Sequence, residues 1–135
     1  MTTGGGISPE MLNEMAGMPD SMRKQMMRGR LEQLLALPDE RRLPAVQGLI
    51  AAIHDRKVKD SDREKLVATR TEIIGEFSEE KRRGIMVART QALKEDPDLN
   101  KADMELTEKV MPQVPADARK AFIETMSKLQ EMSQG

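Results

Sequence analysis

The chain has 135 residues, of which 38% are hydrophobic and 33% are charged, and its formal net charge at pH 7 is −1. This length fits one domain, and the composition is too apolar for intrinsic disorder. The balanced charge argues against a general nucleic-acid-binding surface, because such proteins usually carry a clear basic excess. The chain has no cysteine, which excludes disulfides, thiolate metal sites and thiol nucleophiles.

Two further features of the composition bear on location and fold class. No run of about 18 apolar residues occurs, and the start "MTTGGGISPEML" lacks the regions of a secretory signal, so we expect a cytoplasmic protein without membrane contact. Tryptophan and tyrosine are absent, and only two phenylalanines occur. Because strands favour aromatic and β-branched residues, this composition predicts an all-α fold.

The beginning of the chain predicts a tail followed by a methionine-rich helical segment. Residues 1–7 contain three consecutive glycines, which is typical of a flexible tail because glycine loses much backbone entropy on ordering. The segment 8–36 predicts a short helix over 9–17, with Ser8 as its N-cap, and a longer helix over 19–36.

The rest of the chain predicts two helix pairs and a final helix. The pairs occupy 38–77 and 78–114, the final helix occupies 115–132, and residues 133–135 form a C-terminal tail. Together with the methionine-rich segment, these helices are expected to form a single all-helical domain over 8–132.

Local signals predict where individual helices begin. Ser78 is expected to be an N-cap, and Ser61 with Glu64 forms a capping-box pattern, in which each side chain bonds the other residue's backbone N–H. The stretch "KEDPDLNK" interrupts the helical pattern, so we expect the next helix to begin at about Lys101.

The helix starts recur at a spacing of roughly 40 residues. Pro38 and Ser78 lie 40 positions apart, and Ser78 and Pro115 lie 37 apart. This spacing favours six or seven short helices in a small helical-repeat, α-solenoid-like domain or in a bundle. Because a short repeat array has exposed ends, self-association is a further expectation.

An arginine follows four residues after each of four helix openers. We call these residues the arginine row: Arg23, Arg42, Arg82 and Arg119. In one interpretation, Arg23, Arg42 and Arg82 pair with acids three residues earlier (Asp20, Asp39 and Glu79) on a solvated helix face. Such a pair stabilises a helix by about 0.2–0.5 kcal/mol. In the other, equivalent positions on repeated helices line up and bind an acidic partner.

The methionines concentrate near the N-terminus, with seven of the 12 in the first 27 residues. Methionine is flexible and polarisable, and it suits surfaces that accept varied apolar partners. The pattern therefore predicts a face that docks a partner helix or an apolar peptide, formed by Met11, Met15, Met22, Met26 and Met27. The alternative is that these side chains fill the core in place of aromatic residues.

Few residues point to catalysis. The single histidine, His54, lies near a predicted helix end, where a surface or C-capping role is common. The carboxylates fall in first turns and on polar faces, not in apolar runs where burial would raise a pKa. Phosphate-binding glycine loops are absent from the sequence. We therefore expect no enzyme, no catalytic residue, no cofactor and no metal site.

The stretch "DPDLNKADMELT" contains acids at the spacing of a calcium-binding loop. Asp96, Asp98 and Asn100 occupy the first, third and fifth positions of such a loop. However, Lys101 replaces the turn glycine and Thr107 replaces the bidentate glutamate. A polar connection between helices is the favoured interpretation, and cation binding over Asp96–Thr107 stays open.

Two short stretches resemble segments of known families. The openers "LPDERR" and "FSEEKRR" resemble the helical-repeat starts of magnesium-transporter cytosolic domains and of flagellar-switch proteins. The stretch "PEMLNEMAGMPDSMRKQMM" is similar in texture to methionine-rich segments of signal-recognition and co-chaperone proteins. These resemblances fit an all-helical protein, and no functional residue is assigned from them.

Three function classes follow from these patterns. The leading prediction is a non-catalytic protein–protein interaction or regulatory adaptor module, whose partner is another protein or peptide. The second is nucleic-acid binding by the arginine row with Lys24, Arg41 and Arg83, which the net charge and the scarcity of stacking aromatics disfavour. The third is a small enzyme or ligand carrier with an unrecognised pocket.

Overall fold

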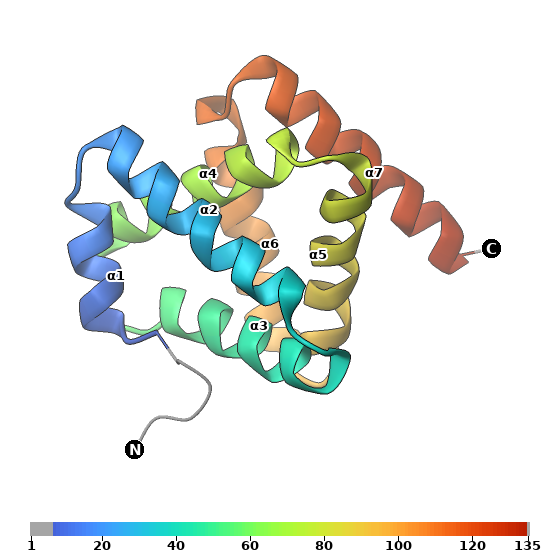
Figure 1. Ribbon diagram of the computed structural model, residues 1–135, viewed down its shortest axis with the longest axis horizontal. Coiled ribbons are helices and arrows are strands. Elements are labelled where there is room, and N and C mark those ends of the chain that lie inside the picture. The colour runs from blue at the N-terminus through green and yellow to red at the C-terminus, as the bar shows by residue number, and fades with distance from the viewer. Residues whose placement is uncertain (1–6, 135) are drawn as a thin grey trace.

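The helix α4 (Asp60–Glu76) lies among the other helices of the computed structural model (Figure 1). The structure describes residues 7–134, without the side chains of residues 133 and 134. Helix α4 contacts each of the other helices described. Its sequence explains this position, because buried residues occur on most sides of the helix: Leu66, Val67, Thr69, Arg70, Thr71, Ile73, Ile74 and Gly75.

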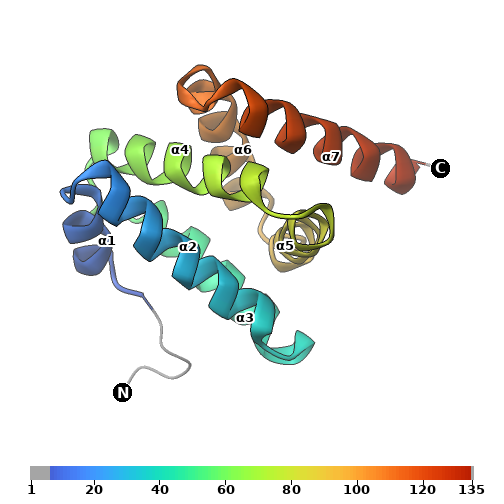
Figure 2. The ribbon, with the colours of Figure 1, turned by 45° about the horizontal axis from the view of Figure 1, so that its top comes forward.

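The remaining helices cover α4 from several directions. They are α1 (Pro9–Ala16), α2 (Asp20–Ala36), α3 (Asp39–Ile53), α5 (Glu79–Ala92), α6 (Pro97–Val110), the short 3₁₀ helix η1 (Met111–Gln113) and α7 (Ala116–Gln134). Figure 2 shows α4 between α2 on one side and α7 on the other, with the C-terminal part of α7 extending beyond the rest of the molecule.

The all-α prediction is confirmed, since the described residues form helices and no strand. Their arrangement is a bundle, because α2 contacts α5 and α4 contacts both α1 and α7, whereas each unit of a solenoid contacts only its neighbours. The internal repeat of roughly 40 residues is not confirmed. Most of the predicted N-terminal tail lies outside the described residues, although Ile7 packs against the core. At the other end, α7 continues to Gln134, past the predicted end at 132.

Two predicted N-caps are confirmed, and two predicted helix starts are wrong. The hydroxyl oxygens of Ser8 and Ser78 accept backbone N–H bonds from the third residue after each cap, at 3.2 and 3.3 Å. The predicted capping box at Ser61 does not form, because α4 already begins at Asp60 and its N-terminus has no side-chain cap. Similarly, α6 begins at Pro97 and not near Lys101.

A glycine allows α4 and α7 to pack in direct backbone contact. A Cβ atom built on Gly75 would lie 2.2 Å from the carbonyl oxygen of Ala118, far inside van der Waals contact. Nearby, Phe77 and Phe122 are both buried, and the rest of the core consists mainly of leucine, isoleucine, valine, alanine and methionine. This close approach sets the position of the last helix on the bundle.

We expect Gly75→Ala to lower the free energy of unfolding by about 3 kcal/mol, because the added methyl group meets backbone that no rotamer change can move away. Urea denaturation followed by far-ultraviolet circular dichroism measures this difference.

Gly29→Ala is the matched control, since a Cβ on Gly29 meets nothing within 4 Å. That change should raise the free energy of unfolding by about 0.5–1 kcal/mol, because alanine is the better helix former. Equal effects of the two substitutions would contradict the close contact between α4 and α7.

Candidate functional site

An arginine occupies the fourth position of α2, α3, α4 and α5 and folds back over the loop before its helix. We call these residues the clamp arginines: Arg23, Arg42, Arg63 and Arg82. Each donates to the carbonyl oxygen of the apolar residue that stands two positions before its helix. The acceptors are Met18 at 3.0 Å, Leu37 at 2.6 Å, Val58 at 2.7 Å and Phe77 at 2.7 Å.

The same guanidinium groups also reach the end of the preceding helix. Arg63 is the most complete case, because it bonds the carbonyl oxygens of Ile53 and Asp55, both at 2.8 Å, and pairs with Asp60 at 2.7 Å. The last carbonyl groups of a helix have no partner inside it, and a guanidinium supplies up to five donors in one plane. The clamp arginines therefore satisfy the end of one helix from the start of the next.

These contacts explain most of the arginine row. Three of its members, Arg23, Arg42 and Arg82, direct their guanidinium groups into the fold. Of the three predicted acid pairs, Arg23 with Asp20 and Arg42 with Asp39 form, whereas Arg82 and Glu79 form no ion pair in the described structure. A partner-binding role for the row stays a prediction, but these bonds favour the structural interpretation.

Two arginines depart from the predicted pattern. The sequence pattern did not include Arg63, because the residue that opens its helix is Lys59 and not proline or serine. Lys59 nevertheless has an apolar residue before it and an acid after it, Val58 and Asp60, as two of the proline openers do. Arg119 is partly buried, and its side chain has no hydrogen bond or ion pair with the described residues.

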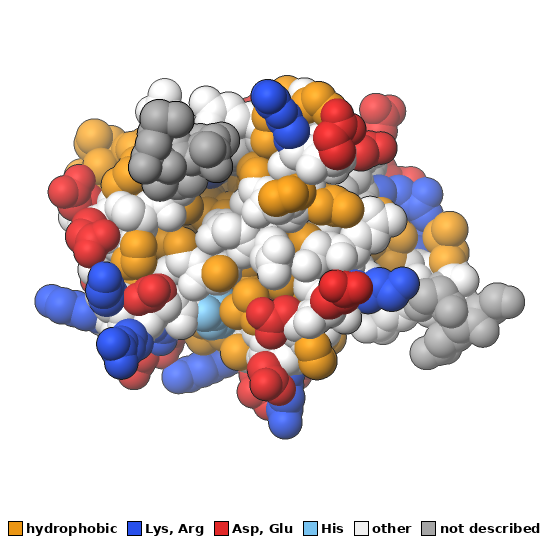
Figure 3. Space-filling view, turned by 90° about the horizontal axis from the view of Figure 1, so that it is seen from below, with side chains coloured by type: hydrophobic (Ala, Val, Ile, Leu, Met, Phe, Trp, Pro, Cys, Tyr) orange, Lys and Arg blue, Asp and Glu red, His pale blue; other side chains and the backbone are white. Residues whose placement is uncertain are grey.

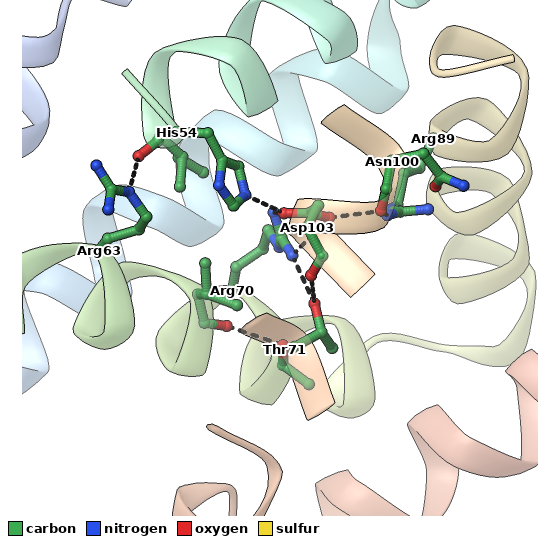
Figure 4. A network of polar contacts seen from close by, with 10 residues as sticks. His54, Arg63, Arg70, Thr71, Arg89, Asn100 and Asp103 are labelled. Atoms are coloured by element: carbon green, nitrogen blue, oxygen red, sulfur yellow. Dashed lines mark hydrogen bonds and ion pairs between the residues drawn. The ribbon is translucent and has the colours of Figure 1, made fainter. Parts of the chain in front are cut away.

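A second polar cluster is buried where α3, α4, α5 and α6 meet (Figure 4). Its centre is Asp103 of α6, whose side chain is 0% exposed. Arg70 of α4 binds both carboxylate oxygens, at 3.0 and 3.1 Å, and Arg89 of α5 binds Oδ2 at 2.9 Å. His54, which follows α3, places Nε2 at 2.9 Å from Oδ1, and Thr107 accepts from Arg70 at 3.2 Å. We call this set the Asp103 cluster.

The charges of the cluster keep Asp103 ionised. Burial alone would raise the pKa of its carboxyl group, but the attraction of Arg70, the bond from His54 and the charge of Arg89 outweigh burial and hold that pKa well below its usual range. Burial lowers the pKa of the Arg89 guanidinium, and the neighbouring charge of Asp103 opposes that shift. Two guanidinium groups therefore surround one carboxylate.

The arrangement is suited to holding helices together. Each oxygen of Asp103 accepts two bonds, so neither retains the free lone pairs that a general base requires. The ring of His54 is fixed through Nε2 at the end of α3, where its backbone N–H also bonds the helix. The cluster thus joins four helices through one carboxylate.

Several sequence predictions are corrected by this cluster. His54 lies at a helix C-cap as predicted, but its side chain is only 11% exposed and does not serve a surface role. The expectation that the carboxylates fall in first turns and on polar faces is wrong for Asp103, which is buried inside α6. Its spacing from Leu99, Leu106 and Val110 places it on the inward stripe of α6, and this spacing is the signal that could have identified it.

The calcium-loop alternative is also contradicted. Asp96 accepts the backbone N–H of Leu99 at 3.2 Å as the N-cap of α6, so the stretch is helical from Pro97 and does not form a loop around an ion. Among the described residues, no three histidine, aspartate or glutamate side chains are grouped to hold a metal ion. None of the helices in residues 7–134 has the length and hydropathy needed to cross a bilayer.

The five predicted face methionines divide between core and surface. Met15 and Met27 are 3% and 0% exposed and belong to the core, whereas Met11, Met22 and Met26 are 45%, 50% and 46% exposed. The sequence proposed core filling and partner docking as alternatives for the whole group. The structure places part of the group in each setting.

Met22 and Met26 belong to an exposed stripe of α2 without a charged side chain. We call it the α2 face: Met22, Gln25, Met26, Gly29 and Gln33. Two basic residues of this helix face α4, since Lys24 pairs with Glu72 and Glu76 and Arg28 pairs with Glu76 as well. These ion pairs direct the charges of Lys24 and Arg28 away from the α2 face.

Beyond its first turn, where Asp39, Glu40 and Arg41 are exposed, the outer side of α3 is also uncharged. Figure 3 shows this side of the molecule, where hydrophobic and uncharged groups fill the middle of the view and charged groups surround it. The exposed residues of α3 there include Pro44, Gln47, Gly48 and Ala51. Short side chains make this surface smoother and less apolar than the α2 face.

We expect Arg63→Met to lower the free energy of unfolding by about 2 kcal/mol, because three carbonyl groups lose a charged donor. Arg56→Met is the control, since Arg56 is exposed, and it should change stability by less than about 0.5 kcal/mol. Thermal and urea denaturation measure both. Unchanged stability of the Arg63 variant would show that the clamp is not needed for the fold.

Asp103→Asn should lower the free energy of unfolding by about 3–5 kcal/mol, because two partly or fully buried guanidinium groups lose their counter-charge. Asp39→Asn removes an exposed ion pair instead and should cost less than about 1 kcal/mol.

The pH dependence of this difference has a definite sign. Because the pKa of Asp103 is lowered in the folded state, its contribution is fully present above the ordinary carboxyl pKa of about 4 and declines below it. The stability gap between wild type and Asp103→Asn should therefore shrink as the pH falls below about 4. A constant gap down to pH 2 would contradict the ionised state of Asp103.

Comparison of the chain with models of protein families, with curated proteins and with solved structures finds no match. The resemblance of the helix openers to those of transporter and flagellar-switch domains therefore gains no support from this comparison. The bonds of the clamp arginines explain why the helix starts of this chain share one residue pattern. A functional proposal has to come from the chain's own surfaces.

Proposed function

We propose that the protein is a non-catalytic interaction module that binds a helix of another protein on the α2 face. The observation that carries this proposal is the exposure of Met22 and Met26, 50% and 46%, on a stripe without charge. In a chain that is 33% charged, such a stripe favours apolar contact over ion pairing. Methionine side chains adapt to the shape of an apolar partner.

The spacing of the α2 face indicates a helix as the partner. Met22, Met26, Gly29 and Gln33 follow one another at intervals of four, three and four residues, which is the spacing of a helix–helix seam. Gly29 is exposed. The fold of this chain does not require a glycine at that position, because a Cβ atom added there would have no neighbour within 4 Å. Glycine lowers the stability of a helix by about 0.5–1 kcal/mol relative to alanine. The close approach of a second helix would explain why glycine occupies this position.

Nucleic-acid binding has less support. The arginine row was its main element, and three of the four guanidinium groups bond carbonyl oxygens of the protein itself. Those groups are not available to phosphates without loss of the helix connections. Salt dependence distinguishes the two classes, because phosphate contacts weaken steeply with salt and apolar docking does not.

The test begins with a photo-crosslinking residue at position 22, and with the same residue at position 123 as control, since Ile123 is an exposed apolar residue of α7. A protein captured at position 22 alone is then purified, and its affinity is measured for the wild type and for variants. Concentrations are followed by peptide-bond absorbance, because the chain has neither tryptophan nor tyrosine.

We expect the double substitution Met22→Lys/Met26→Lys to lower the affinity for the purified partner at least about 10-fold. Two ammonium groups would then be buried where apolar side chains make contact. Gln47→Lys/Ala51→Lys on α3 and Ile123→Lys on α7 should leave the affinity unchanged. Equal losses in all three variants, or recovery of nuclease-sensitive partners only, would overturn the proposal. Light scattering that shows concentration-dependent mass, lost in the double methionine variant, would assign a second copy of the chain as the occupant.

A further inference from the structure

A groove of about 410 Å³ lies between α3 and α5, away from the residues of the α2 face. Apolar side chains contribute to its lining, including Leu43, Val87 and Ala88, and Val87 is 38% exposed. Its volume is in the range of small-ligand sites, about 300–1,000 Å³. Arg83 of α5 lines the same groove.

Arg83 is half-buried, and it differs from the clamp arginines in its bonding partners. Its Nε atom is buried and has no hydrogen-bond partner in the described chain, and its Nη2 contacts only the thioether sulfur of Met132, at 3.5 Å. Sulfur is a weak acceptor, whereas the clamp arginines and the Asp103 cluster all bond oxygen atoms. A buried N–H without an acceptor is destabilising, so the position of the Arg83 Nε has no structural explanation within this fold.

The charges around the groove do not neutralise Arg83. Asp39 lies on its rim but pairs with Arg42 at 3.0 Å, so these two charges offset each other. Glu79 and Glu80 precede Arg83 by four and three residues, yet neither forms an ion pair with it in the structure described. The groove therefore combines an unpaired cation with an aliphatic lining.

We infer that this groove binds a segment of a partner polypeptide that presents a carboxylate next to an aliphatic side chain. The carboxylate pairs with the Arg83 guanidinium and takes the place of the Met132 thioether, whose residue is 65% exposed and free to turn away. The aliphatic side chain packs on Leu43 and Val87. This inference is independent of the α2 face, because it uses other residues and charge instead of apolar contact alone.

The probe is an acetylated and amidated peptide, Ala-Leu-Glu-Leu-Ala, titrated into the ¹⁵N-labelled full chain and followed by amide chemical shifts. Its matched control has glutamine in place of glutamate, and therefore differs only in the charge. We expect the glutamate peptide to shift the amide signals of Leu43, Gly84 and Val87 and to bind at least about 10-fold more tightly than the control.

Arg83→Met should remove the difference between the two peptides, whereas Arg41→Met, which changes an exposed arginine of α3, should keep it. The Arg83 variant should also unfold at a temperature about 2–8 °C higher without ligand, because a buried unsatisfied donor is gone. Val87→Glu places a carboxylate four residues after Arg83 on the same helix. This variant should remain folded and should no longer bind the glutamate peptide.

The inference is overturned if both peptides bind equally or not at all, or if the Arg83→Met variant still prefers the glutamate peptide. A lower unfolding temperature of Arg83→Met would also contradict it, because Arg83 would then have a structural role.

Discussion

The unpaired carbonyl groups at helix ends are the constraint on which this fold depends. Seven short α-helices within residues 9–134 create many such ends, and a bundle of this kind buries several of them. The clamp arginines meet the constraint at four successive helix starts, always from the fourth position of the following helix. Each junction thereby acquires a fixed direction, because the same planar group contacts the end of one helix and belongs to the next.

The Asp103 cluster adds a second level of order, between helices that are distant in the chain. A single carboxylate at 0% exposure requires compensating donors, and Arg70, Arg89 and His54 provide them from three other helices. Replacing such a cluster by apolar residues can leave stability unchanged, but breaking it is costly. It therefore ties α6 to a particular register against α3, α4 and α5, which apolar packing alone would specify less strictly.

The pairing of charged side chains within the fold determines which exposed surfaces are uncharged. Lys24 and Arg28 pair with acids of α4, the clamp arginines bond carbonyl groups, and α2 is left with an uncharged outer stripe. Against this background Arg83 stands out as a guanidinium with a buried donor and no oxygen partner. The two proposed binding surfaces thus differ in chemistry: the α2 face selects by apolar shape, and the α3–α5 groove selects by charge.

The sequence by itself determined the helical class and most helix bounds, because capping residues, prolines and apolar periodicity are local signals. It also identified the recurring arginines, although only the folded chain revealed that Arg23, Arg42 and Arg82 turn inward. The sequence could not foresee the central place of α4 or the Asp103 cluster. Both depend on contacts between residues 14–52 positions apart, and local periodicity carries no information on which stripes will meet.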